Sequence, residues 1–343
     1  MTSPYDALLL LSFGGPEGPE DVMPFLLNVL RGRHIPPDRL REVASHYEHF
    51  GGVSPINEHC RALIAALREE LERNGPRLPV YWGNRNWHPM LADTLREMAG
   101  DGVRRALAFV TSAFSSYSGC RQYLEDITRA RTEVGDRAPV VAKLRVFYNH
   151  PGFVEPMIER VAVAFDLIPE PRRAEARLVY TAHSLPRALA ATSDYEAQLK
   201  EAARLVTGGL GRNGWSLVYQ SRSGPPGQPW LEPDIVDHLR ALALEGVQDV
   251  VVAPLGFVSD HMEVVYDLDL EAKSRAVELG LDMVRAGTVG SHPRFVRMIR
   301  ELVLERFTED PVRRHLGTRG PAPDQCPADC CPPPARPASH RSD

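Results

Sequence analysis

The chain has 343 residues, of which 43% are hydrophobic and 25% charged, and its formal net charge at pH 7 is −5. This composition is typical of a globular protein long enough for two domains. The negative net charge disfavours a nucleic-acid-binding role, which needs a basic face. No apolar stretch reaches the roughly 18 residues that span a membrane. The short apolar run Ala7–Leu11 lacks the basic flank and cleavage site of a signal peptide, so we expect a cytoplasmic protein without stable membrane insertion.

Short apolar, β-branched runs alternate along the chain with segments of helix length. The strand-like runs are Ala7–Phe13, Pro79–Trp82, Arg105–Thr111, Val140–Phe147, Arg177–Ala182, Ser216–Gln220, Asp249–Pro254 and Met283–Gly287. Amphipathic helical patterns cover Asn57–Glu72, Pro151–Phe165, Tyr195–Val206, Pro233–Leu244 and Pro293–Phe307. This alternation predicts an α/β fold in which helices cover parallel sheets.

The first four and the last four strands are each enough for one sheet, which predicts two similar halves with a cleft between them. We place the N-terminal half at residues 1–149, the C-terminal half at 150–316 and a tail at 317–343. The tail is rich in proline, which is incompatible with a helix or a central strand. Its composition predicts disorder unless its cysteines hold it in place.

Polar residues that look catalytic follow two of the predicted strands. His183 comes directly after the strand Arg177–Ala182, and a row of acids follows the strand Asp249–Pro254. In open α/β sheets, ligands bind outside the carboxyl ends of the strands. A core histidine that only satisfies its own hydrogen bonds is the simpler interpretation of His183 taken alone. Together with the acids, however, it suggests a neutral imidazole base at a catalytic cleft.

The acids Glu263, Asp267 and Glu271 are spaced four residues apart, so a helix would stack them on one face. Like charges at this spacing repel each other. One interpretation is an ordinary solvated acidic surface. The other is a ladder of carboxylates that passes divalent cations or protons into a site, since oxygen ligands suit such cations without holding them as tightly as thiolates do.

Three of the five cysteines fall within six residues of the tail, at Cys326, Cys330 and Cys331. Four thiolates are needed for a tetrahedral zinc site or an iron–sulfur cluster. Cys120, just past the third strand, is a candidate for the fourth, whereas Cys60 lies within a helical pattern and is better explained by packing. The alternative is a flexible tail with free thiols.

Seven motifs together resemble the ferrochelatase family, the enzymes that insert ferrous iron into a porphyrin. The resemblance runs from about Tyr5 to Phe307. Its motifs are Ser12–Pro16, Leu30–Arg33, Tyr47 with Gly51–Pro55, Trp87–Pro89, Ala182–Pro186, Gln220–Arg222 and Gly256–Glu263. The two histidine-containing strings near His183 and Glu263 are the most specific.

The resemblance implies two Rossmann-like halves that clamp the porphyrin between them. It implies that His183 and Glu263 are catalytic and stand at the porphyrin centre, with Asp267 and Glu271 continuing the path of the Fe²⁺ substrate. His183 would accept protons from the pyrroles, or would instead ligate the metal. Some members carry a tyrosine in the first loop that reaches the product iron, whereas Phe13 stands there in this sequence and cannot ligate.

The cysteines Cys120, Cys326, Cys330 and Cys331 are similar to those of family members that carry a [2Fe–2S] cluster. The resemblance therefore implies this cofactor. Insertion involves no net electron transfer, so we expect a structural or sensing role for the cluster.

The polar stretch that begins at Gly14 resembles the Gram-positive, actinobacterial type of the family, which acts on coproporphyrin III. This substrate has four propionates and protoporphyrin IX has two. Carboxylates at the cleft mouth need donors, and arginine pairs with them through two parallel hydrogen bonds. The substrate-binding candidates are Phe13, Arg31, Arg33, Ser54 and Tyr123.

Three other functions remain as alternatives. The chain could be a protoporphyrin IX ferrochelatase, a cobalt or nickel chelatase, or a non-catalytic tetrapyrrole or metal carrier or sensor. A carrier would bind porphyrin stoichiometrically without turnover. For an enzyme of the haem pathway, a transient hand-off of the product to the next enzyme is the expected partnership.

Overall fold

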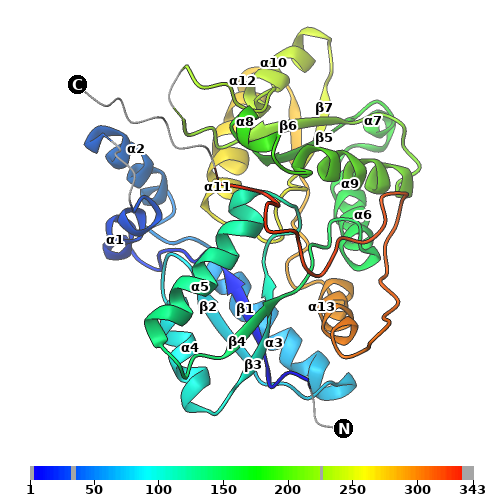
Figure 1. Ribbon diagram of the computed structural model, residues 1–343. Coiled ribbons are helices and arrows are strands. Elements are labelled where there is room, and N and C mark those ends of the chain that lie inside the picture. Colours follow the sequence, from blue (N-terminus) through cyan, green and yellow to red (C-terminus); the bar gives the residue numbers. More distant parts are fainter. Residues whose placement is uncertain (1–3, 32–35, 225–226, 334–343) are drawn as a thin grey trace, which may run out of the picture.

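The computed structural model describes residues 4–31, 36–224 and 227–333, which contain two four-stranded parallel sheets (Figure 1). The first sheet has the order β2-β1-β3-β4 and the second the order β6-β5-β7-β8. Their strands are β1 (Ala7–Ser12), β2 (Val80–Asn84), β3 (Arg105–Val110), β4 (Val140–Lys143), β5 (Arg177–His183), β6 (Ser216–Gln220), β7 (Asp249–Ala253) and β8 (Asp282–Arg285). The repeated order confirms the predicted α/β fold with two similar halves.

All eight predicted strands are present, with small shifts at their ends. The largest difference is at Val140–Phe147, where the strand ends at Lys143. Arg145 leaves the sheet there and pairs with Glu305 in the interior. The largely apolar stretch therefore predicted a strand that was too long, because burial continues at residues 144–147 after the backbone pairing has ended.

Helices connect the strands and cover the sheets. The helical segments are α1 (Pro19–Val29), α2 (Pro37–Glu48), α3 (Ile56–Asn74), α4 (Leu91–Gly100), η1 (Tyr117–Arg121), α5 (Gln122–Val134), α6 (Pro151–Asp166), α7 (Glu170–Arg173), α8 (Arg187–Ala190), α9 (Tyr195–Gly209), α10 (Ile235–Leu244), α11 (Met262–Val264), η2 (Val265–Ala272), α12 (Lys273–Glu278) and α13 (Pro293–Glu305). Two of them, η1 and η2, are π-helical.

Both faces of the first sheet are buried, as the apolar sequence of β1 requires. Leu8 and Leu10 belong to one hydrophobic core and Leu9 and Leu11 to another, and all four are fully buried. A strand covered on both faces reads as a continuous apolar run instead of an alternating one. This is why β1 is a run of leucines.

The two halves share part of their core. α13 follows β8 in the sequence but packs against both α3 and α6 (Figure 1). The ring of Phe109 in β3 lies 5.1 Å from Phe147 and 6.0 Å from Phe295 of α13. The predicted domain boundary between residues 149 and 150 therefore stays a prediction. The side chains of the two halves pack into a shared core.

Residues 317–333 of the tail cross from α9 toward the start of α5 (Figure 1). Asn149 Nδ2 donates to the carbonyl oxygen of Gly320 at 2.7 Å, and Arg319 lies 3.4 Å from Asp194 at the start of α9. Arg121 Nε donates to the carbonyl oxygen of Cys330 at 3.2 Å. Polar contacts therefore hold this part of the tail against the body.

Across the described ranges, none of the helices combines the length and the apolar character that a membrane span requires.

Candidate active site

His183 and Glu263 face each other where the two strands β5 and β7 end. His183 is the last residue of β5, and Glu263 lies in α11, just after the loop that follows β7. Their side chains approach to 3.6 Å between Nε2 and Oε1. His183 Nδ1 lies 2.5 Å from the carbonyl oxygen of Ser184, which directs Nε2 toward Glu263. The hydroxyl of Tyr195 donates to the carbonyl oxygen of His183 at 3.0 Å.

The two side chains shift each other's pKa. Burial lowers the pKa of His183, but the carboxylate of Glu263 outweighs burial and raises it to about 9. Burial likewise raises the pKa of Glu263, and the His183 imidazolium outweighs it and lowers that pKa to about 2. Near neutral pH the pair is thus an imidazolium facing a carboxylate. The sequence suggested a neutral imidazole base, whereas the raised pKa of His183 favours the protonated form of this side chain near neutral pH.

The rest of the acidic row lies on η2. The spacing of Asp267 and Glu271 predicted an α-helix, and the segment is instead π-helical. π-Helical segments are rare in proteins, and those that occur are often found at functional sites. Gln220 Nε2 donates to the carbonyl oxygen of Glu263 at 2.7 Å and to Asp267 Oδ2 at 3.3 Å. The hydroxyl of Ser221 also donates to Asp267, so the end of β6 holds the row.

Asp267 lies close enough to the other carboxylates of the row for their charges to act on it. Burial raises the pKa of Asp267 to about 7, with the charges of Glu263 and Glu271 adding to the effect and the Ser221 hydrogen bond opposing it. Burial and the nearby Asp234 also raise the pKa of Glu271. The attraction of the row for a cation therefore increases as the pH rises through 7.

Helices α1 and α2 of the first half contact this acidic segment. The ring of His46 in α2 stacks on Tyr266 of η2, with centroids 3.8 Å apart and planes within 10°. Met262 of α11 belongs to a hydrophobic cluster with residues of α1 and α2, and Phe13 packs against the same cluster. An apolar cluster from the first half thus borders the acidic segment on one side.

The predicted substrate-binding residues of the first half differ in accessibility. Phe13 is partly buried, with its ring 6.2 Å from Phe25 of α1. Arg31 is exposed and donates to Asn28 Oδ1 at 2.8 Å. Arg33 lies outside the described residues. Ser54 is buried, only 4% exposed.

Tyr123 is also buried, at 5% exposure, and its ring is covered by the guanidinium of Arg85 at 4.7 Å. Arg85 forms a buried ion pair with Asp126 at 2.9 Å and lies 5.8 Å from the ring of Phe13. Tyr123 therefore lies beneath Arg85, and Arg85 in turn lies near the ring of Phe13.

Gln220 and Ser221 were not assigned a role from the sequence. Their position directly after a strand of the second sheet was the available signal, since β6 neighbours β5 and ends at the same edge. Ser221 adopts a φ of 62°, an unusual value for a residue other than glycine. Strained backbone of this kind concentrates at functional sites.

The four candidate cluster cysteines form a chain of contacts. Cys330 Sγ lies 3.5 Å from Cys331 Sγ. A hydrogen bond from the Cys120 thiol lowers the pKa of Cys326, and the same bond together with burial raises the pKa of Cys120. Burial raises the pKa of Cys330 and outweighs the effect of the neighbouring Cys326 thiol, which lowers it. By contrast, Cys60 lies in α3, is buried and belongs to the hydrophobic core.

These thiols do not converge on one point. Within the residues that the structure describes, no group of three or more His, Cys, Asp or Glu side chains has the geometry of a metal site. The donor chemistry nevertheless suits a thiolate-bound group. Four thiols from two distant segments, η1 and the tail, lie next to one another. Cys331 also adopts the left-handed conformation, with a φ of 51°.

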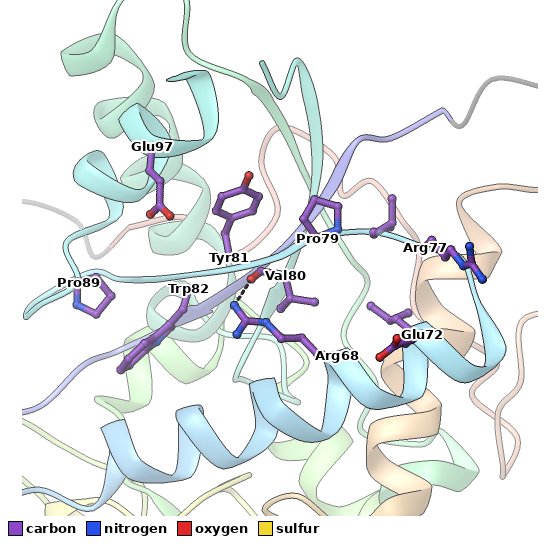
Figure 2. Close-up of a pocket in the computed structure, with 11 residues that line it drawn as sticks. Arg68, Glu72, Arg77, Pro79, Val80, Tyr81, Trp82, Pro89 and Glu97 are labelled. Carbon is purple, nitrogen blue, oxygen red and sulfur yellow. Dashed lines mark hydrogen bonds between the residues drawn. The ribbon is translucent and has the colours of Figure 1, made fainter. Parts of the chain in front are cut away.

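A surface groove lies away from this site. A groove of about 940 Å³ runs along β2, the edge strand of the first sheet, and is lined by α3, α4 and the strand itself (Figure 2). Arg68 crosses it and donates to the carbonyl oxygen of Val80 at 2.9 Å. Tyr81 and Trp82 point to opposite sides of the strand (Figure 2). The groove contains none of the predicted site residues, so its size says nothing about the chemistry of His183 and Glu263.

Comparison with known proteins connects this geometry to a family. Residues 5–307 match the ferrochelatase family model. A ferrochelatase of Rhodopirellula baltica is 55% identical over 329 residues, covering 96% of this chain and 93% of that protein. A coproporphyrin III ferrochelatase of Streptomyces griseus is 53% identical over 352 residues, covering 96% of this chain and 94% of that protein.

Among solved structures, SirB from Bacillus subtilis with Fe³⁺ aligns with a TM-score of 0.52 at 12% identity, covering 89% of this chain and all of that one. That likeness shows a shared chelatase fold. The match over nearly the whole chain shows that this protein is a metal chelatase and belongs to the ferrochelatase family.

Proposed function

We propose that the protein inserts ferrous iron into coproporphyrin III and thereby forms coproheme, in the cytoplasm. The observation that carries the proposal is the His183–Glu263 pair, 3.6 Å apart, which opens onto the acidic row of η2. The side chain of His183 is 32% exposed and that of Glu263 is 47% exposed, so a ligand can reach both. The substrate assignment is supported by relatives of 52–54% identity that are named coproporphyrin III ferrochelatases.

Insertion requires two pyrrole N–H protons to leave as Fe²⁺ enters the ring. His183 is the proposed acceptor of these protons, one after the other. It must first release to solvent the proton that Glu263 stabilises on it, and it passes each pyrrole proton on in the same way through its partly exposed side chain. An approaching cation disfavours the imidazolium electrostatically, so loading of iron beside Glu263 would prepare His183 as a base. Asp267 and Glu271 are proposed to supply iron to Glu263, since carboxylate oxygens bind divalent cations without holding them tightly.

The four propionates of coproporphyrin III need donors at the cleft mouth. Arg31 and Arg33 are proposed for this role, together with Ser54 and Tyr123. Ser54 and Tyr123 are 4% and 5% exposed, so they would contact a substrate only with a shift of their neighbours. The exposed Arg31 is the most accessible of the described candidates.

An anaerobic assay with Fe²⁺, offering coproporphyrin III and protoporphyrin IX separately, tests the proposal. We expect fast turnover of coproporphyrin III alone. Preference for protoporphyrin IX would keep the reaction and overturn the substrate. Stoichiometric binding without turnover of either porphyrin would support a carrier or sensor instead.

We further propose that Cys120, Cys326, Cys330 and Cys331 hold a [2Fe–2S] cluster. The contacts among their thiols support this donor set. When bound, such a cluster would supply a cross-link between distant parts of the chain. The cysteines themselves would fix the tail to η1, the π-helical turn that contains Cys120.

The product of insertion must then be passed on, and we propose a transient encounter with the next enzyme of the haem pathway.

A further inference from the structure

The segment from Asp260 to Glu271 contains more acids than the metal path uses. Its five carboxyl groups belong to Asp260, Glu263, Asp267, Asp269 and Glu271. Crowded carboxylates repel one another and, without compensation, would push the segment apart. The partners of these groups therefore decide which acids remain available to a cation.

Two of the five acids share one arginine. Arg285 is the last residue of β8, and its side chain is 18% exposed. Its Nε and Nη2 donate to the two carboxylate oxygens of Asp269 at 2.5 and 2.9 Å. Its Nη1 and Nη2 also donate to Asp260, at 3.3 and 3.0 Å. The planar guanidinium thus binds two carboxylates in fork geometry, which a lysine cannot reproduce.

The two carboxylates flank the catalytic segment. Asp260 directly precedes His261, whose Nδ1 accepts a hydrogen bond from the backbone nitrogen of Glu263 at 3.1 Å. Asp269 lies in η2, two residues after Asp267. One side chain therefore ties together the beginning of the segment and its π-helical part. Thr288 adds a hydrogen bond to Asp260 Oδ1 at 3.0 Å and fixes that end to the loop after β8.

The ion pairs with Arg285 also divide the five acids of the segment into two groups. In the part of the chain that the structure describes, the ion pairs between this segment and an arginine are those of Asp260 and Asp269 with Arg285. Glu263 instead faces His183, and Asp267 accepts from Gln220 and Ser221. Among the described residues, Glu263 and Asp267 thus have no arginine as an ion-pair partner.

We infer that Arg285 is a positioning residue for metal insertion: by binding Asp260 and Asp269 it sets the placement of Glu263 and Asp267, and it leaves these two acids without an arginine partner. This inference rests on the proposed function. Arg285 is assigned no contact with iron or porphyrin, and it acts through the segment that it holds.

The test compares Arg285→Gln, Arg285→Lys and the double variant Arg285→Gln/Asp269→Asn with the wild-type enzyme. The double variant restores the local charge balance without restoring the clamp. The matched control is Arg240→Gln, which removes an exposed ion pair with Asp237 on α10. The readouts are kcat and KM for Fe²⁺ with coproporphyrin III, the porphyrin Kd from fluorescence quenching, and the melting temperature.

We expect Arg285→Gln to lower kcat about 10-fold to 100-fold through misplacement of the acids. It should raise KM for Fe²⁺ and leave the porphyrin Kd unchanged. The double variant should regain the melting temperature but not kcat, and the lysine variant should keep its fold without regaining wild-type kcat. Arg240→Gln should behave as wild type.

Wild-type kcat in Arg285→Gln would overturn the inference. Recovery of kcat together with the melting temperature in the double variant would also overturn it, because Arg285 would then serve stability alone. If Arg285→Gln does not fold, the lysine and double variants decide the question by the same criteria. Failure of the wild-type enzyme to insert iron into either porphyrin would instead remove the proposed function, and the inference with it.

Discussion

Ser221 donates its hydroxyl hydrogen bond to the carboxylate of Asp267, and so joins the end of β6 to the middle of η2. Gln220 Nε2 also donates a hydrogen bond to Asp267 Oδ2, at 3.3 Å. The carboxyl group that continues the metal path is thus held by a neighbouring strand, while burial and nearby acids keep its pKa near 7.

The pH dependence of metal use should follow Asp267. Its pKa of about 7 is raised, so the group is neutral below pH 7 and becomes a carboxylate as the pH rises. We expect kcat/KM for Fe²⁺, measured at saturating porphyrin, to rise between pH 6 and 8 with an inflection near 7. Asp267→Asn should lower the value and remove the inflection. An unchanged inflection in this variant would assign it to another group.

Replacement of His183 should stop the chemistry and spare porphyrin binding. The loss of a positioned proton acceptor typically costs roughly 10²- to 10⁴-fold in rate. We expect His183→Ala to reduce kcat by this amount, while fluorescence quenching still reports porphyrin binding. His315→Ala, which changes an exposed histidine near the tail, is the control. Turnover of His183→Ala at the wild-type rate would contradict the assignment.

The buried ion pair between Arg145 and Glu305 should be needed for stability. The side chains are 1% and 5% exposed, and Arg145 Nη2 also donates to the carbonyl oxygen of Arg314 at 3.1 Å. Removal of one partner leaves a buried charge uncompensated, so Arg145→Leu should cost about 3 to 5 kcal/mol in the free energy of unfolding. Chemical denaturation measures this change.

The double variant Arg145→Leu/Glu305→Leu separates charge burial from packing. It removes both charges, so it should be more stable than Arg145→Leu. A double variant less stable than either single variant would show that the pair itself stabilises the fold.

The proposed cluster predicts a coloured protein. Cys330→Ser should lose visible absorbance and lower the melting temperature, because the tail would lose its link to Cys120. Cys60→Ser changes a thiol in the core of α3 and should keep the colour. Colourless wild-type protein, purified without oxygen and with iron supplied, would contradict the cluster.

Local periodicity was sufficient for the outline of the fold. Each run of apolar residues long enough for a buried strand became one, because backbone pairing and burial favour the same residues. The position of His183 followed from this pattern, since a polar residue directly after a strand lies at the edge of a parallel sheet. The four-residue spacing of Glu263, Asp267 and Glu271 likewise indicated that they belong together.

Other features depend on contacts between residues far apart in the chain, and no local pattern predicts them. The π-helical form of η2 accompanies hydrogen bonds from Ser221 and Gln220 and the pairing of Asp269 with Arg285. The pKa of His183 is raised chiefly by the carboxylate of Glu263, which lies 80 residues further along the chain. Pairing energies of this kind exist only once the strands and loops of the second half have packed together, so the electrostatics and the exact shape of the site were decided by the tertiary structure.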